Sequence, residues 1–84
     1  MIMATDVEQL ANNQFIILEN NRTIFQSYDS IIAVIENGNT TLDVNKWDYS
    51  KTTGKYRNIF LNETKKKTDL KIKNGIYRLS DLNC

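Results

Sequence analysis

The sequence has no histidine, no proline and only three glycines, and its single cysteine is the last residue, Cys84. Without histidine, the chain lacks the usual general base and the commonest metal ligand. It also lacks the glycine-rich loop that would hold a nucleotide phosphate. Its ten acidic residues leave a catalytic pair of carboxylates formally open, but no motif places two of them together. We therefore expect no enzymatic activity, no metal site and no cofactor.

Disulfide and membrane signals are also missing. One cysteine cannot form an internal disulfide, which is typical of a reducing compartment. No run approaches the roughly 20 apolar residues of a membrane span, and Met1-Ile2-Met3 does not have the form of a signal peptide. The 84 residues, 40% of them hydrophobic, suffice for one small core, to which a dimer or a partner would add stability. We expect a single cytoplasmic domain (1–84), monomeric or homodimeric, with no membrane contact.

Charge is divided unevenly between the two halves of the chain. Residues 1–50 contain two basic and seven acidic residues, a net charge of −5. Residues 51–84 contain nine basic and three acidic residues, a net charge of +6, so that the whole chain carries +1. The sequence thus predicts an electrical dipole, with a basic C-terminal half that favours acidic partners.

The first half alternates short apolar runs with asparagine-rich turns. Thr5-Asp6-Val7-Glu8 has the form of a capping box, which predicts a short N-terminal helix. The apolar runs that follow predict an antiparallel β-meander, and Asn37-Gly38 is a strong turn signal within it. The strands are expected at about 14–19, 23–35 (two strands interrupted at Asp29-Ser30) and 40–44.

The second half begins with a helical pattern. Ser50 is a suitable N-cap, and Tyr56 and Phe60 fall at helical spacing behind it. These features predict a helix over 51–62, with the two aromatic residues facing the meander. The fold class is therefore α+β.

The last segment fits two structures. Thr64 is a suitable N-cap for a helix that Gly75 would end. Alternatively, Asn74-Gly75 would form the turn of a β-hairpin that pairs Ile72 with Tyr77. The strict alternation of apolar and basic residues just before this turn favours the hairpin.

The segment Trp47-Asp48-Tyr49-Ser50-Lys51-Thr52-Thr53 is the most specific stretch of the sequence. With an F-x-S-Y segment at 25–28, Phe60-Leu61 and a basic segment ending at Ile72-Lys73-Asn74-Gly75, it resembles a group of small uncharacterised bacteriophage proteins. The resemblance covers about residues 24–76. It implies a phage or prophage product in the cytoplasm of a bacterial host, and it implies no particular activity. Because similar proteins have a longer basic helical pattern before the glycine, it favours a second helix at 65–74.

Two functions fit these observations. The first is a non-enzymatic phage accessory protein that occupies a surface of a host or anti-phage defence complex and so inhibits or redirects it, as an anti-CRISPR inhibitor does. The segment 47–57 would carry this function, because it offers aromatic and charged side chains where the acidic and basic halves meet. Its candidate partner-binding residues are Trp47, Tyr49, Lys51, Lys55, Tyr56 and Arg57.

The alternative function is nucleic-acid binding by the basic C-terminal half, in which lysines and arginines would contact phosphates. Its candidate residues are Lys65, Lys66, Lys67, Lys71, Lys73 and Arg78. Each candidate also has an ordinary structural interpretation. Trp47 and Tyr56 are typical core residues, and a run of lysines is typical of a solvated helix face.

Overall fold

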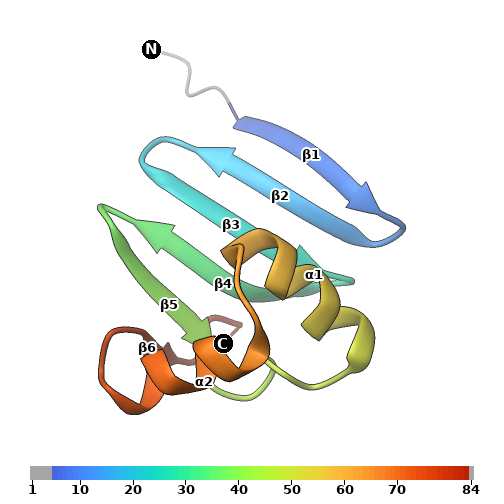
Figure 1. Ribbon diagram of the computed structural model, residues 1–84. Coiled ribbons are helices and arrows are strands. Elements are labelled where there is room, and N and C mark those ends of the chain that lie inside the picture. Colours follow the sequence, from blue (N-terminus) through green and yellow to red (C-terminus); the bar gives the residue numbers. More distant parts are fainter. Residues whose placement is uncertain (1–4, 84) are drawn as a thin grey trace.

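The computed structural model describes residues 5–83 and shows a six-stranded sheet with both helices on one of its faces (Figure 1). The strands lie across the sheet in chain order; β1 to β5 are antiparallel, and β6 runs parallel to β5. The predicted α+β class is confirmed. The elements are β1 (Thr5–Ala11), β2 (Gln14–Glu19), β3 (Arg22–Ser27), β4 (Ser30–Glu36), β5 (Asn39–Asp43), α1 (Lys51–Leu61), α2 (Lys65–Lys73) and β6 (Arg78–Ser80).

Two-residue turns join the five antiparallel strands, and each turn contains a residue with a left-handed backbone. The φ angle is 62° at Asn13, 50° at Asn20 and 53° at Asn37, the last in the predicted Asn-Gly turn. Asparagine adopts this conformation more readily than most residues. The third turn uses Tyr28, with φ 59°, and here the backbone N–H of Tyr28 donates to the carbonyl of Asn13.

The predicted N-terminal helix is wrong, because residues 5–11 form strand β1. In this strand Asp6 lies opposite Leu18 and Val7 lies opposite Ile17. A single helical turn is marginal by itself, whereas the extended segment gains pairing along the whole of β2. Met1–Ala4, Cys84 and the side chain of Thr5, on which the capping box depended, lie outside the described residues.

The core lies between the sheet and the helices. Its fully buried centre contains Phe25, Ile32, Ala33 and Leu42. Phe60 of α1 stacks on Phe25 with ring centroids 5.6 Å apart. Partly buried residues pack around this centre; they are Leu10, Trp47, Tyr56, Phe60, Leu61, Ile72 and Tyr77. The predicted inward face of the first helix is therefore confirmed, and Trp47 is part of the core.

Both predicted helices in the second half are confirmed to within one residue. The Ser50 hydroxyl accepts from the N–H of Thr53, and Thr64 caps α2 in the same way. The hairpin alternative is wrong, because the N–H of Asn74 donates to the carbonyl of Leu70 and so continues the helix. The chain then returns to the sheet as β6, whose pairing with β5 the sequence pattern did not predict. Within residues 5–83, neither helix is long and apolar enough to cross a membrane.

One buried side chain is poorly accommodated. Gln14 on β2 is fully buried, yet neither atom of its amide group has a hydrogen-bond partner among the described residues. Ser27, which lies opposite Gln14 in the sheet, forms its hydrogen bond with Thr53 of α1 instead, with the two hydroxyl oxygens 2.9 Å apart.

We expect Gln14→Met to raise the free energy of unfolding by about 1–2 kcal/mol, because an unpaired buried amide is destabilising and Met has a similar shape. Urea denaturation measures this change. The control is Gln26→Met, which should lower stability, because the amide nitrogen of Gln26 donates to the carbonyl of Tyr28. A loss of more than 1 kcal/mol in Gln14→Met would contradict the interpretation.

Candidate functional site

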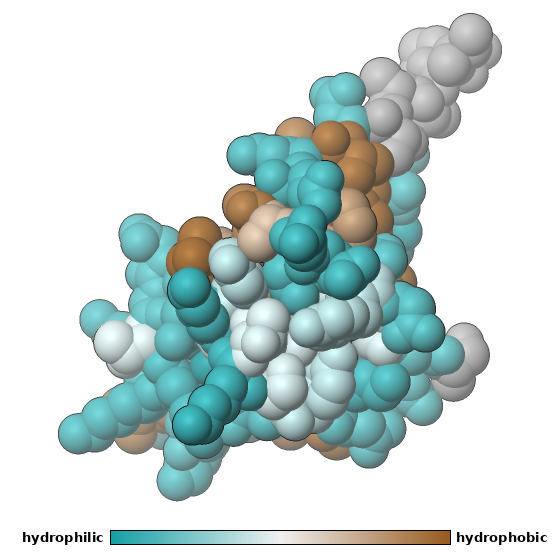
Figure 2. Space-filling model, turned by 90° about the vertical axis from the view of Figure 1, so that its right-hand side faces the viewer, coloured by the Kyte–Doolittle hydropathy of each residue, from teal (hydrophilic) through white to brown (hydrophobic). Residues whose placement is uncertain are grey.

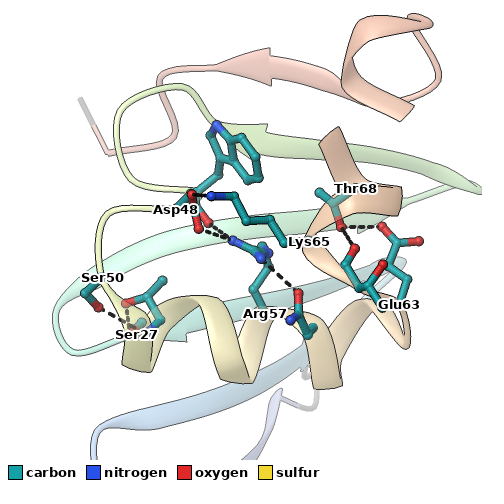
Figure 3. A network of polar contacts seen from close by, with 11 residues as sticks. Ser27, Asp48, Ser50, Arg57, Glu63, Lys65 and Thr68 are labelled. Atoms are coloured by element: carbon teal, nitrogen blue, oxygen red, sulfur yellow. Dashed lines mark hydrogen bonds and ion pairs between the residues drawn. The ribbon is translucent and has the colours of Figure 1, made fainter. Parts of the chain in front are cut away.

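A buried arginine organises the segment between the sheet and α1. Only 1% of the Arg57 side chain is exposed. Its Nη1 donates to the carbonyl oxygen of Trp47 at 2.7 Å and to Oδ1 of Asp48 at 3.0 Å, and its Nη2 donates to Oδ1 of Asn58 at 2.8 Å (Figure 3). The guanidinium also lies 5.1 Å from the centroid of the Trp47 ring, in cation–π contact. These contacts fix the position of Trp47 and Asp48.

The same carboxylate extends the network to the second helix. Oδ2 of Asp48 lies 2.7 Å from Nζ of Lys65, the first residue of α2. Burial alone would raise the pKa of Asp48. The hydrogen bonds from Lys65 and Arg57 outweigh this effect, so that the pKa lies below its ordinary value. Asp48 is therefore ionised at neutral pH and links α1 to α2.

A shallow hollow of about 500 Å³ lies beside this network. Gly54 contributes no side chain to its wall, and the exposed side chains of Lys51, Lys55 and Lys65 surround it. Asp48 is its single acidic residue. Such an arrangement attracts carboxylate or phosphate groups. The residues that line the hollow are Asp48, Ser50, Lys51, Gly54, Lys55, Arg57, Asn58 and Lys65.

The structure separates the predicted partner-binding residues into three groups by their exposure. Tyr49, Lys51 and Lys55 are exposed and available for contacts. Trp47 and Tyr56 are half-buried and pack against the core. The expectation that Arg57 would contact a partner directly is wrong, because its guanidinium is buried and is engaged by Trp47, Asp48 and Asn58. The position of Arg57 in the sequence did not indicate that its side chain is buried.

The residues predicted to bind nucleic acid do not form one surface. Lys65, Lys66 and Lys67 are exposed at the beginning of α2. Lys71 pairs with Glu63, and Lys73 pairs with Asp69. Arg78 lies opposite Thr41 in the sheet, on the face away from the helices. Of these six residues, Lys65 is the one that lines the hollow.

Sequence reasoning missed a second polar cluster around Glu63, whose side chain is 4% exposed. Its carboxylate accepts hydrogen bonds from Thr68 Oγ1 at 2.6 Å, Lys71 Nζ at 2.7 Å and Tyr77 Oη at 2.9 Å (Figure 3 shows the Thr68 bond). Burial would raise the pKa of Glu63, but the donors together lower it below its ordinary value. The cluster holds the turn between the helices against the segment that leads to β6.

The chain belongs to a family of unknown function, DUF8033, whose model matches residues 1–76. The match spans strands β1 to β5 and both helices, and stops before β6. It thus includes the Arg57 network and the hollow. No curated protein and no solved structure matches the chain significantly.

We expect Glu63→Gln to destabilise the protein by about 1–3 kcal/mol at neutral pH, since hydrogen bonds to a buried charged group are lost. The folded-state pKa of Glu63 is lowered, so its stabilising contribution is present above the unfolded pKa of about 4.3 and is lost as the pH falls through the folded pKa. The stability difference between the two proteins should therefore shrink progressively as the pH is lowered from neutral through about 4.3 and below. Urea denaturation across this range measures it, and a difference independent of pH would contradict the assignment.

Proposed function

We propose that this protein is a non-enzymatic binding protein that attaches to an acidic surface of a partner through the lysines around the hollow. One observation carries the proposal: Lys51 and Lys55 lie one turn apart on α1, both exposed, beside a network that holds their helix in place. Exposed cations on a helix that is held in place favour specific and fast association with an acidic surface. The exposed ring of Tyr49 adds the aromatic contact that interfaces favour.

We propose further that the partner is a host or anti-phage defence complex in a bacterial cell, which this protein inhibits or redirects. The support is the resemblance of residues 24–76 to small bacteriophage proteins. Inhibition by surface occupation requires no reactive group, which suits a chain without histidine. An anti-CRISPR-like inhibitor would act in this way, by covering an acidic patch that the complex needs.

Nucleic-acid binding is the second candidate, and the exposed lysines at 65–67 favour it. Phosphates bound there would make affinity fall steeply with salt, with a log–log slope of about −0.9 for each contact on duplex DNA. Lys71 and Lys73 are paired with acidic residues, and Arg78 lies on the other face of the sheet, so few of the candidate residues are available together and we rank this function second.

Affinity capture from host lysate tests the first proposal, with Lys51→Glu/Lys55→Glu as the test variant and Lys66→Glu/Lys67→Glu as the control of equal charge change. We expect the wild type and the control to retain the same host protein, and the test variant to lose it. All three should be about equally stable, because exposed charges rarely contribute more than ~1 kcal/mol.

Two outcomes would contradict this expectation. If the wild type retains no host protein reproducibly above background, the proposed function is wrong. If instead the Lys66→Glu/Lys67→Glu variant loses the captured material, and nuclease or moderate salt releases that material from the wild type, the protein binds nucleic acid.

A further inference from the structure

Strand β1 forms an open edge of the sheet. Among residues 5–83 its only neighbour is β2, and no helix covers it (Figure 1). Residues 6–9 are all exposed. Such a strand of seven residues presents unpaired backbone N–H and C=O groups, and proteins usually shorten or cover edges of this length.

The side chains of β1 alternate in character between the two faces of the sheet. Glu8 lies opposite Ile16, which lies opposite Phe25, and Phe25 stacks on Phe60 of α1. Glu8 and Asp6 are therefore on the face that carries the helices. Val7 is on the other face and is 60% exposed. Apolar residues also reach the surface close by, since Leu18, opposite Asp6, is 43% exposed. Figure 2 shows apolar surface in the upper part of the molecule.

A second copy of this chain is a poor partner for the edge. If two β1 strands paired antiparallel with all seven residues overlapping, Glu8 of one copy would lie opposite Glu8 of the other. In the register centred on Val7, Asp6 would lie opposite Glu8 twice. The register centred on Gln9 would run through the irregularity between Gln9 and Ala11. Directly opposed like charges destabilise a strand pair.

We propose that β1 docks an extended segment of another protein that has lysine or arginine at alternating positions and apolar residues between them. Such a segment would add a seventh strand through backbone hydrogen bonds. Its basic side chains would lie beside Asp6 and Glu8 on one face, and an apolar side chain would cover Val7 on the other. The charges that prevent self-pairing thus select a partner of opposite sign.

This inference does not rest on the proposed function. The hollow is built from α1, α2 and the residues before α1, whereas the edge is built from β1 alone. Reversing the charges at one surface leaves the other intact, so the two proposals fail or succeed separately.

The probe is the peptide acetyl-Gly-Lys-Val-Lys-Val-Lys-Gly-amide, with a scrambled peptide of sequence Gly-Lys-Lys-Lys-Val-Val-Gly as its control. We expect wild-type protein to bind the alternating peptide at least tenfold more tightly than the scrambled one, measured by fluorescence anisotropy. Binding should also slow amide hydrogen exchange within residues 5–11.

The matched variants are Asp6→Lys/Glu8→Lys and Asp29→Lys/Glu36→Lys, which change the net charge equally. The first should bind the lysine peptide at least tenfold more weakly than the wild type and should instead bind the corresponding alternating glutamate peptide. This gain of binding would also show that the variant is folded. The second should behave as the wild type.

The proposal is overturned if the wild type does not bind the alternating peptide, or binds both peptides equally. Unchanged affinity in Asp6→Lys/Glu8→Lys, or exchange protection outside residues 5–11, would also overturn it. A wild-type dimer that dissociates on Glu8→Lys would make a second copy the occupant and would likewise contradict the proposal.

Discussion

The guanidinium of Arg57 is a buried charge, and the arrangement of the helical layer depends on how that charge is satisfied. An isolated ion in the protein interior is strongly unfavourable, so it requires hydrogen-bonded partners around it. The carbonyl of Trp47, the carboxylate of Asp48 and the amide of Asn58 supply them to Nη1 and Nη2, while Nε has no partner among the described residues. Because Asp48 also holds Lys65, the same contacts set the position of α2. The otherwise irregular chain between β5 and α1 is fixed by this network.

The most specific motif of the sequence therefore has a structural explanation. Trp47 and Asp48 engage Arg57, Ser50 caps α1, and Thr53 bonds to Ser27 of β3. The motif leaves Tyr49, Lys51 and Thr52 exposed, and Lys55 lies one turn further along. The residues proposed to bind a partner thus lie between residues that hold the fold. This division explains how one short segment serves both purposes.

The helices and the central strands could be predicted because local signals agreed with the final packing. Strand β1 was mistaken for a helix because Thr5–Glu8 imitates a capping box, although Asn12-Asn13, eight residues before Asn20-Asn21, is the turn signal that would have revealed it. The pairing of β6 with β5 could not be predicted, because it depends on where α2 returns the chain. The burial of Arg57 was equally hidden, since it requires partners up to ten residues away to converge.

The free energy of unfolding of Arg57→Met, compared with that of Lys55→Met on the same helix, tests the central claim most directly. Methionine keeps the aliphatic bulk but leaves the Trp47 carbonyl and the Asp48 carboxylate without their donor. We predict that Arg57→Met loses about 3 kcal/mol, whereas Lys55→Met, at an exposed position, changes by less than about 1 kcal/mol. If Arg57→Met were as stable as Lys55→Met, the buried guanidinium would not be the constraint on which the helical layer depends.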